Sequence, residues 1–568
     1  MKIEDNKILN LIIFSMIFIF LINGSIIFNN NFTYAKDYNI ASGLDNNEIQ
    51  NIINNAVSGS RIIFSGSNYN NISLVISKTL TIISNVETKI YGCSSSDGNS
   101  DSSAFYFKEG SEGSSIKGFN IIAKDHGITI HNTSNINIYN NKISNASKSG
   151  ISIESSKNVT SFNNNITNNY VGVNVEKSDK VNIKKNKIYN NKKKGINIVS
   201  SNNTIIVDNN VNNNNNGISV ENTLKSNISN NEIRNNALHG IELNGATEKT
   251  YITKNNISKS TRGIYLNSNS KNDVIRSNYI NNNDYQGIDV DDDLPYGVGI
   301  LFGHNFNFDD SDVDISKNSI TDNSQFSIRA PSDGDLVHIG ANWLGSNDPE
   351  KTQLCHRVDS SLIKAYFQKT ANGYQLIFYD GNSIVSGLAS FPVTFYLNGK
   401  AVQTSQVING MATFNGSMDR YNINNLTVSF GKDILSMKIL PTLSNGGYEE
   451  PYTVVGNNKN DGLNGNRNGN NEGNGIGNND GDGKGNSGLK NTKNSNSNIG
   501  GSSSGGTYDS ATKTVAAKEI QMEDNNYKIN ENNSIILIIT IILFLTIVIG
   551  YVFQKFRNDF NFLRSSDK

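Results

Sequence analysis

A short phrase recurs eight times along the middle of this chain and limits its fold more than any other feature. The phrase reads Gly-Ile-x-Ile, a spacer, and then Ile-x-x-Asn-x-Ile-x-Asn-Asn. Its glycines stand 22 to 24 residues apart, at Gly127, Gly150, Gly172, Gly195, Gly217, Gly240, Gly263 and Gly287. A second marker keeps this period with one longer last step, at Asn141, Asn164, Asn186, Asn209, Asn231, Asn255, Asn278 and Asn318. A fixed period of this size is typical of a solenoid, in which each repeat packs against its neighbours.

The pattern inside each repeat is that of β-strands. Apolar residues alternate with polar ones, as at Ile151 and Ile153 or at Ile241 and Leu243, and a period of two is strand periodicity. Three short strands per repeat predict an all-β, right-handed parallel β-helix with inward columns of Ile and Val. The repeated asparagine suits a corner because Asn tolerates left-handed φ, and its amide can pair with the amides above and below. A chance run in an Asn-rich chain is the alternative, and eight matches in eight repeats argue against it.

The overall composition favours no particular partner. The formal net charge is -1 at pH 7, so no global field directs the chain to nucleic acid or to a membrane surface. Only Cys93 and Cys355 occur, which is too few for a disulfide framework. They flank the repeats, and coils spaced by about 4.8 Å would separate the two sulfurs by roughly 40 Å. We therefore expect two free or buried thiols.

Apolar segments stand near both ends of the chain. Two lysines precede an apolar run and Ala35 offers a small residue for cleavage, so residues 1–35 are predicted to be a signal peptide, with an uncleaved anchor as the alternative. Residues 535–553 carry no charge and are long enough to cross the hydrocarbon core as a transmembrane helix. Cationic residues predominate in residues 554–568, which places this tail in the cytoplasm. The predicted location is a single-pass cell membrane protein with most of its chain outside the cell.

Between these ends, the first predicted segment is a cap. Residues 40–126 are expected to hold irregular first coils, and Asp45-Asn46-Asn47-Glu48 has the form of a helix capping box. A short helix over about residues 46–57 would cover the open end of the solenoid. Residues 127–350 are the predicted β-helix, and an insertion of about 20 residues interrupts it between Val290 and Val313.

The pattern changes after the repeats. Residues 360–440 carry Asn398-Gly399 and Asn409-Gly410 between alternating stretches. Asn-Gly at such positions predicts hairpins, and several short strands suggest a small immunoglobulin-like sandwich. Residues 445–534 are rich in Gly, Asn and Ser and are predicted to be a disordered linker, because they cannot bury enough apolar surface to fold.

Strand alternation identifies the side chains that face outward on the first strand of each repeat. Four outward carboxylates make a candidate ligand-binding face: Glu154, Glu176, Glu221 and Glu242. Near the insertion, alternation places Asp289, Asp291 and Asp293 on one face, and several carboxylate oxygens suit Ca²⁺. A solvated acidic surface is the competing interpretation of both groups. Ca²⁺ is the one cofactor that the sequence suggests.

No complete catalytic constellation is present, so no catalytic residue is assigned and an enzymatic role stays open. The histidines show no metal-ligand spacing, and neither a Gly-x-Ser-x-Gly motif nor a P-loop occurs. Six lysines crowd one coil: Lys184, Lys185, Lys187, Lys192, Lys193 and Lys194. Such a cluster can bind a polyanion, and it can also serve only solubility.

The repeats give the chain a resemblance to known families. The Gly-Ile-x-Ile and Asn-x-Ile coils resemble the parallel β-helix (PbH1) repeats of NosD-type and pectate-lyase-like proteins. The order of cap, β-helix, Asn342-Trp343-Leu344-Gly345 closure, sandwich and anchor resembles the Asn/Thr-rich adhesin-like surface proteins of archaea, although Leu344 replaces the second aromatic residue expected there. This resemblance implies a surface protein that binds carbohydrate polymers or other cells. The alternative that it implies is a surface polysaccharide lyase or hydrolase.

Overall fold

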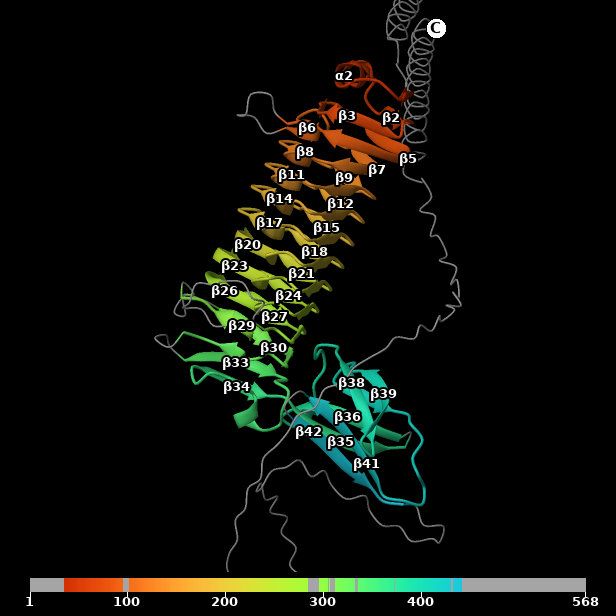
Figure 1. Ribbon diagram of the computed structural model, residues 1–568. Helices are drawn as coiled ribbons and strands as arrows, with labels where there is room; N and C mark the ends of the chain where they lie inside the picture. The colour runs from red at the N-terminus through yellow and green to blue at the C-terminus, as the bar shows by residue number, and fades with distance from the viewer. Residues whose placement is uncertain are drawn as a thin grey trace, which may run out of the picture. The chain divides into compact units, whose positions relative to one another are not determined.

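The computed structural model describes residues 35–94, 102–284, 296–304, 306, 312–331, 336–371, 373–430 and 433–441 (Figure 1). The predicted signal peptide (apart from Ala35), the linker, the transmembrane segment at 535–553 and the tail lie outside these residues. Within the described part of the chain, no helix is long and apolar enough to cross a membrane.

Two parallel sheets build the solenoid, and Figure 1 shows the coils stacked in chain order. Sheet B, with 11 strands, consists of β4 (Leu74–Ile76), β6 (Ser103–Phe107), β8 (His126–His131), β11 (Ser149–Glu154), β14 (Val171–Glu176), β17 (Lys194–Val199), β20 (Asn216–Leu224), β23 (His239–Glu248), β26 (Arg262–Lys271), β29 (Val298–Phe302) and β32 (Phe326–Arg329). Every pair of neighbours in sheet B is parallel. The predicted right-handed parallel β-helix is confirmed.

Sheet A, with 21 strands, supplies the other two strands of each coil. Its first coils contain β1 (Asp37–Ile40), β2 (Arg61–Phe64), β3 (Asn68–Ile72), β5 (Thr81–Gly92) and β7 (Ser115–Ile122). The strand before each ladder asparagine belongs to β9 (Asn137–Tyr139), β12 (Thr160–Phe162), β15 (Asn182–Lys184), β18 (Ile205–Val207), β21 (Asn227–Ser229), β24 (Tyr251–Thr253), β27 (Asp273–Arg276) and β30 (Val313–Ser316). The strand after it belongs to β10 (Lys142–Ser144), β13 (Asn165–Thr167), β16 (Lys187–Tyr189), β19 (Asn210–Asn212), β22 (Glu232–Arg234), β25 (Asn256–Ser258), β28 (Tyr279–Asn281) and β31 (Ser319–Thr321).

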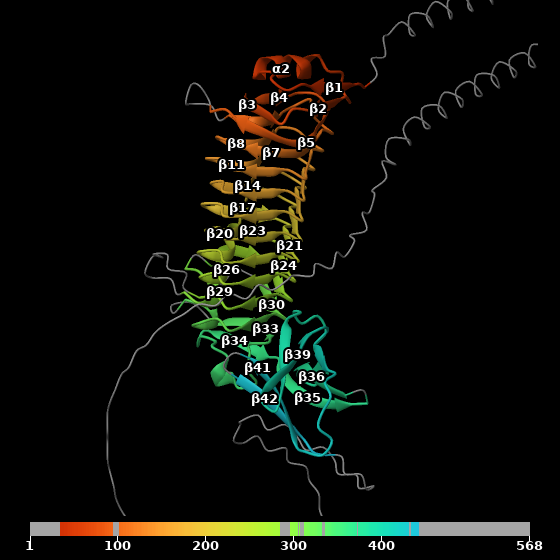
Figure 2. The same cartoon turned by 45° about the vertical axis from the view of Figure 1, so that its right-hand side comes forward.

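The cap helix forms where the capping box predicts it. Helix α2 (Asn46–Asn55) begins after Asp45, whose Oδ1 accepts from the Glu48 backbone N–H at 2.9 Å, while the Asp45 N–H donates to Glu48 Oε2 at 2.8 Å. Ile49 and Ile53 are buried in the core that runs through the solenoid. Figure 2 shows α2 lying across the end of the stack. The helix therefore covers apolar side chains that the first coil would otherwise expose.

The repeat glycine breaks the alternation of each sheet B strand. A Cβ on Gly195 would point inward, 2.7 Å from the Gly217 carbonyl oxygen and 2.9 Å from Nδ2 of Asn214. Gly195 and the next residue, Ile196, therefore both face the interior, and the residue before the glycine faces outward. Only glycine fits at this position, because contacts below 3.0 Å would force the backbone apart.

The position predicted for the eighth repeat glycine is wrong. The strand that pairs with β26 is β29, with Ile264 opposite Ile300, so Gly299 takes the place expected for Gly287. Gly287 lies outside the described residues. The prediction failed because the inserted residues come before this strand as well as after it, and spacing alone cannot locate the strand within an insertion.

The repeated asparagines form the predicted ladder. Nδ2 of each donates to Oδ1 of the next at 3.0 to 3.2 Å, from Asn141 through Asn318 to Asn342. The expected left-handed φ falls instead on the preceding residue, such as Asn163 or Lys185, at 52° and 53°. The chain turns at that residue, which leaves the asparagine free to direct its amide inward.

A second ladder lies five residues further along each coil. Asn169 donates to Asn191, Asn191 to Asn214 and Asn214 to Asn236, at 3.0 to 3.1 Å. These asparagines were not predicted to form a ladder, although each one is the last residue of a repeated phrase. The two ladders satisfy the polar groups of the corners, which would otherwise be buried without partners.

The solenoid closes through a short irregular segment. Strands β33 (Val337–Asn342) and β34 (Val358–Leu362) form a two-stranded parallel sheet, and a 3₁₀ turn at Pro349–Lys351 lies between them in the chain. Trp343 is fully buried and packs edge-on against Phe378 and Phe430, with ring centroids 5.1 and 5.0 Å away. Both cysteines are free, as predicted.

Residues 364–439 form two antiparallel sheets of four strands that share one apolar core. One sheet contains β35 (Lys364–Thr370), β36 (Gly373–Asp380), β37 (Ser383–Ile384) and β40 (Met411–Phe414), and the other contains β38 (Pro392–Leu397), β39 (Lys400–Gln406), β41 (Asn424–Phe430) and β42 (Asp433–Ile439). The Asn398-Gly399 hairpin joins β38 to β39 as predicted. The immunoglobulin-like assignment stays a prediction.

Candidate functional site

The outer face of sheet B carries three columns of side chains along the solenoid. Relative to each repeat glycine, they occupy the preceding position and the second and fourth following positions. The register places Glu154 beside Glu176, with Val199 and then Glu221 on the next two strands. Glu242 lies in the neighbouring column, between Ser219 and Tyr265. All four glutamates predicted from alternation therefore occupy this one sheet.

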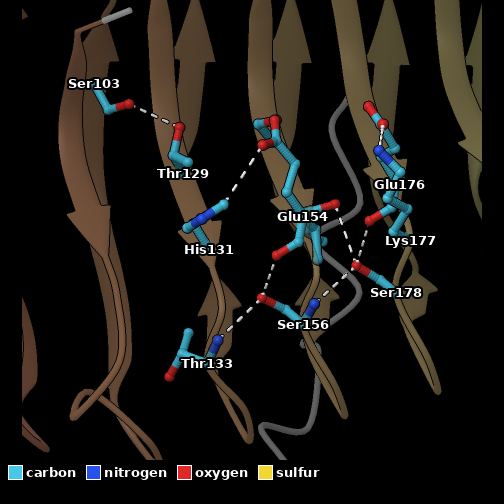
Figure 3. Close-up of polar contacts among 11 residues, drawn as sticks. Ser103, Thr129, His131, Thr133, Glu154, Ser156, Glu176, Lys177 and Ser178 are labelled. Carbon is cyan, nitrogen blue, oxygen red and sulfur yellow. Dashed lines mark hydrogen bonds and ion pairs between the residues drawn. The ribbon is translucent and has the colours of Figure 1, made fainter.

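An open polar stretch covers β6 to β14 (Figure 3). Nδ1 of His131 lies 3.6 Å from Oε2 of Glu154, and the two side chains are 44% and 39% exposed. The other carboxylate oxygen of Glu154 accepts from Ser152 Oγ at 2.9 Å. The Tyr106 ring stacks on the His131 ring with centroids 6.2 Å apart. Burial, with a smaller contribution from the charge of Glu154, raises the pKa of Tyr106, so its phenol stays protonated and can donate a hydrogen bond.

The next coil continues the same row of acceptors. Oε1 of Glu176 pairs with Nζ of Lys177 at 2.9 Å, and this hydrogen bond raises the pKa of Lys177. The neighbouring column holds short amides here, and Asn197 donates to Asn174 at 2.7 Å while accepting from Lys194 Nζ at 3.0 Å. Amide side chains therefore lie beside carboxylates and an ammonium group, so many hydrogen-bond donors and acceptors share one face of the sheet.

A second, more buried cluster lies on β20, β23 and β26. Oε2 of Glu242 accepts from Asn216 Nδ2 and Ser219 Oγ, both at 2.8 Å. His239 stacks on Tyr265, with ring centroids 4.6 Å apart, and it lies opposite Arg262 in the strand register. His239, Arg262 and Tyr265 are buried and Glu242 is half-buried.

The members of this cluster differ in the direction and cause of their pKa shifts. Burial lowers the pKa of His239 to about 4, against the opposing charge of Glu242, so the imidazole is neutral at pH 7. Burial acts to raise the pKa of Glu242. Attraction to the protonated form of His239 and hydrogen bonds, one of them from Ser219, have the opposite effect and outweigh burial, so the net pKa of Glu242 is lowered. Burial raises the pKa of Tyr265 and lowers that of Arg262. A neutral imidazole, a carboxylate, a phenol and a guanidinium thus share one small area.

Glu242 was predicted to lie on this face, but its neighbours His239 and Arg262 were not. His239 and Arg262 stand immediately before a repeat glycine, and regular alternation assigns that position to the interior. The inward glycine reverses the assignment. The available signal was chemical, since a histidine, an arginine and Lys194 recur at a position that alternation would bury.

The predicted calcium residues cannot be placed. Asp289, Asp291 and Asp293 lie outside the described residues. Leu301 of β29 occupies the register position beside Tyr265, so the repeat spacing that motivated the calcium assignment does not hold at this strand. The calcium site stays a prediction without that support, and a calorimetric scan with and without Ca²⁺ on the native chain and on Asp291→Asn would test it. Among the described residues, no group of three or more His, Cys, Asp and Glu side chains could hold a metal ion.

Several solved structures match this chain at low similarity. The A-module of the Azotobacter vinelandii mannuronan C-5 epimerase AlgE6 is 16% identical, with 53% of this chain and 90% of that chain covered and a TM-score of 0.44. The Dettilon tailspike protein is 13% identical, with 69% and 74% covered and a TM-score of 0.44. The periplasmic alginate epimerase AlgG is 19% identical, with a TM-score of 0.33, and the match covers 36% of this chain and 57% of AlgG. No curated protein matches this chain significantly.

One family model matches most of the described solenoid. It is described as periplasmic copper-binding protein (NosD), and it matches residues 53–227, 97–298 and 195–377. Copper prefers imidazole, thiolate and thioether ligands, but Cys93 and Cys355 stand at opposite ends of the solenoid and the described residues gather no three-ligand group. The described residues therefore do not fit a copper centre. On the extent of the match, which spans more than half of the sequence, this chain belongs to the NosD family.

Proposed function

We propose that this protein binds carbohydrate polymers along the outer face of sheet B. The observation that supports this is the open row Tyr106, His131, Glu154 and Glu176, whose members lie on four successive strands. Carboxylates accept hydrogen bonds from pairs of sugar hydroxyls, and aromatic rings pack against the apolar faces of sugar rings. A flat, rigid face that repeats coil by coil suits a polymer that also repeats, because each coil can present its groups to a successive sugar.

The cellular setting of the proposal comes from the sequence. The predicted signal peptide, the linker and the apolar segment at 535–553 motivate a membrane-anchored, adhesin-like surface protein of the archaeal type. In that setting the linker would hold the solenoid away from the membrane, where it could contact a polysaccharide or another cell. Protease shaving of intact cells tests this location: release of the solenoid supports it, and complete protection of the solenoid contradicts it.

Binding to a glycan array tests the ligand class. The full chain should bind some of the polysaccharides on the array, and the double variant Glu154→Ala, Glu176→Ala should not bind them. Glu232→Ala is the matched control, because Glu232 is a partly exposed glutamate on sheet A with Asn256 as its hydrogen-bond partner. Equal binding by the double variant and the control would contradict a role for this face.

A polysaccharide lyase or hydrolase is the second candidate function, and the Glu242 cluster favours it. A neutral imidazole and an ionised carboxylate can act as base and electrostatic partner, and a phenol can act as acid. The burial of His239, Arg262 and Tyr265 makes binding by the open face the better-supported proposal. Release of reducing ends or of unsaturated products from an acidic polysaccharide would establish the enzyme if His239→Ala or Glu242→Ala abolished it and Glu154→Ala did not.

A further inference from the structure

A stripe of two aromatic rings with a lysine at either end runs along sheet A, away from the sheet B face. Lys117, Tyr139, Phe162 and Lys184 occupy the same register on β7, β9, β12 and β15. We call these four residues the lysine–aromatic stripe. Phe162 is 36% exposed, so its ring is accessible to a ligand. The stripe therefore places two aromatic rings on adjacent coils with a cation at either end.

The lysines lean over the rings. Nζ of Lys117 lies 5.5 Å from the centroid of the Tyr139 ring, and Nζ of Lys185 lies 5.9 Å from that of Phe162. Further along the same two coils, just before sheet B, Nζ of Lys193 lies 5.8 Å from the Tyr170 ring, which is 43% exposed. Such contacts are weak at exposed sites, so an incoming ligand can displace the ammonium groups from the rings.

The positive charge of this coil is not balanced by carboxylates of the same coil. No Asp or Glu occurs between Asp179 and Asp208, and seven lysines do, namely Lys180, Lys184, Lys185, Lys187, Lys192, Lys193 and Lys194. The described ion pairs include none of these seven. Like charges held on one rigid coil repel one another, and an anionic partner would relieve that repulsion.

We propose that the lysine–aromatic stripe, with Lys185 and Lys187 beside it, binds an acidic polysaccharide. This inference shares the ligand class of the proposed function, but it concerns a different face, on sheet A, and it specifies the charge of the polymer. The rings would pack on sugar faces, and the lysines would pair with carboxylate or sulfate groups. Two observations favour a glycan over a nucleic acid: the stripe contains no arginine, the residue that best fits phosphate, and the whole chain has a pI near 6.6 where nucleic-acid-binding domains are strongly basic.

Affinity electrophoresis of the full chain in gels that contain polygalacturonate tests the proposal, with neutral dextran as the reference gel. The triple variant Lys184→Gln, Lys185→Gln, Lys187→Gln should bind polygalacturonate about tenfold more weakly, and its affinity should depend less on salt concentration. Lys225→Gln, Lys254→Gln, Lys259→Gln removes the same charge from exposed corner positions of later coils, and should leave binding within about twofold. Phe162→Ala should weaken binding, whereas Tyr251→Ala, which removes another exposed ring on sheet A, should not.

Several outcomes would overturn the stripe. Absence of polygalacturonate binding would do so, and equal weakening by the two lysine triples would reduce the effect to net charge. Tighter retention of single-stranded DNA than of polygalacturonate, with the same loss in the triple, would assign the stripe to nucleic acid instead. The Glu154→Ala, Glu176→Ala variant separates this inference from the proposed function. If this variant no longer binds polygalacturonate while the lysine triple variant still does, the sheet B face is the binding site and the proposal for the stripe is wrong. The reverse result would leave the stripe as the binding face.

Discussion

Nδ2 of Asn209 donates to Oδ1 of Asn231 on the next coil at 3.0 Å, and the same oxygen accepts the Asn209 backbone N–H at 2.9 Å. One amide therefore satisfies two donors of its neighbour. Nδ2 of Asn209 also donates to the carbonyl of Ile183, on the coil before, at 2.8 Å. The ladder thus connects three coils through one side chain.

Replacement of Asn209 by Leu should destabilise the protein far more than replacement of Asn197 by Leu. The first change leaves buried groups without partners, at about 1–3 kcal/mol for each unsatisfied group. Asn197 is half-buried on the outer face, where water can replace its lost contacts. Thermal unfolding followed by circular dichroism compares the two variants, and equal melting temperatures would contradict the structural role of the ladder.

Gly195→Ala should destabilise the solenoid although it adds one methyl group. The new Cβ would lie 2.7 Å from the Gly217 carbonyl oxygen and 2.8 Å from Cγ1 of Val211, and overpacking of this kind costs about 1–3 kcal/mol. Gly92→Ala is the control, because its Cβ would find no atom closer than 3.4 Å. Chemical denaturation measures both variants. A Gly195→Ala midpoint at or above that of Gly92→Ala would show that the interior can yield at this position.

Acidification should destabilise the native protein partly through His239. Burial lowers its pKa to about 4 in the folded state, below the usual value of about 6.5 that holds when unfolded. The unfolded chain therefore binds more protons between these values, so stability is fully present above about pH 6.5 and is lost as the pH falls toward 4. The charged and titrating groups around His239 are Glu242, Arg262, Tyr265 and Lys194.

The variant His239→Asn isolates this contribution. The difference in unfolding free energy between native protein and variant should change by up to about 1.4 kcal/mol per pH unit between pH 6.5 and 4. Denaturant titrations at a series of pH values measure it. A difference that stays constant across this window would mean that His239 is not held neutral by burial.

Trp343→Ala should destabilise the closing segment, while Trp343→Phe should cost much less. The indole is fully buried between Phe378 and Phe430, and truncation to Ala leaves a large cavity, at about 3–5 kcal/mol. Its Nε1 has no hydrogen-bond partner among the described residues, so Phe loses no hydrogen bond. Trp343 is the one tryptophan of the chain, and its emission in the native protein should shift to the red on unfolding. Denaturation followed by circular dichroism compares the two variants, and equal midpoints for them would contradict this assignment.

The sequence by itself determined the solenoid, because its period records contacts that every coil repeats. A glycine must recur wherever a Cβ would meet the next coil, and an asparagine must recur wherever its amide pairs with the coil beyond. The cap helix was equally predictable, since its capping box and its buried Ile49 and Ile53 are local in sequence. The alternation also placed Glu154, Glu176 and Glu221 on one face, because side chains on a regular strand alternate.

The tertiary structure alone decided what breaks the pattern. The inward glycine turns His239 and Arg262 to the outer face, against the alternation that would bury them. The strand that pairs with β26 contains Gly299 rather than Gly287, because the inserted residues interrupt the regular spacing from which the register was predicted. The lysine–aromatic stripe is likewise invisible in the sequence, since Lys117, Tyr139, Phe162 and Lys184 stand about 22 residues apart and meet only when the coils stack. Repetition fixes a coil locally, whereas a surface site depends on which coils lie next to one another.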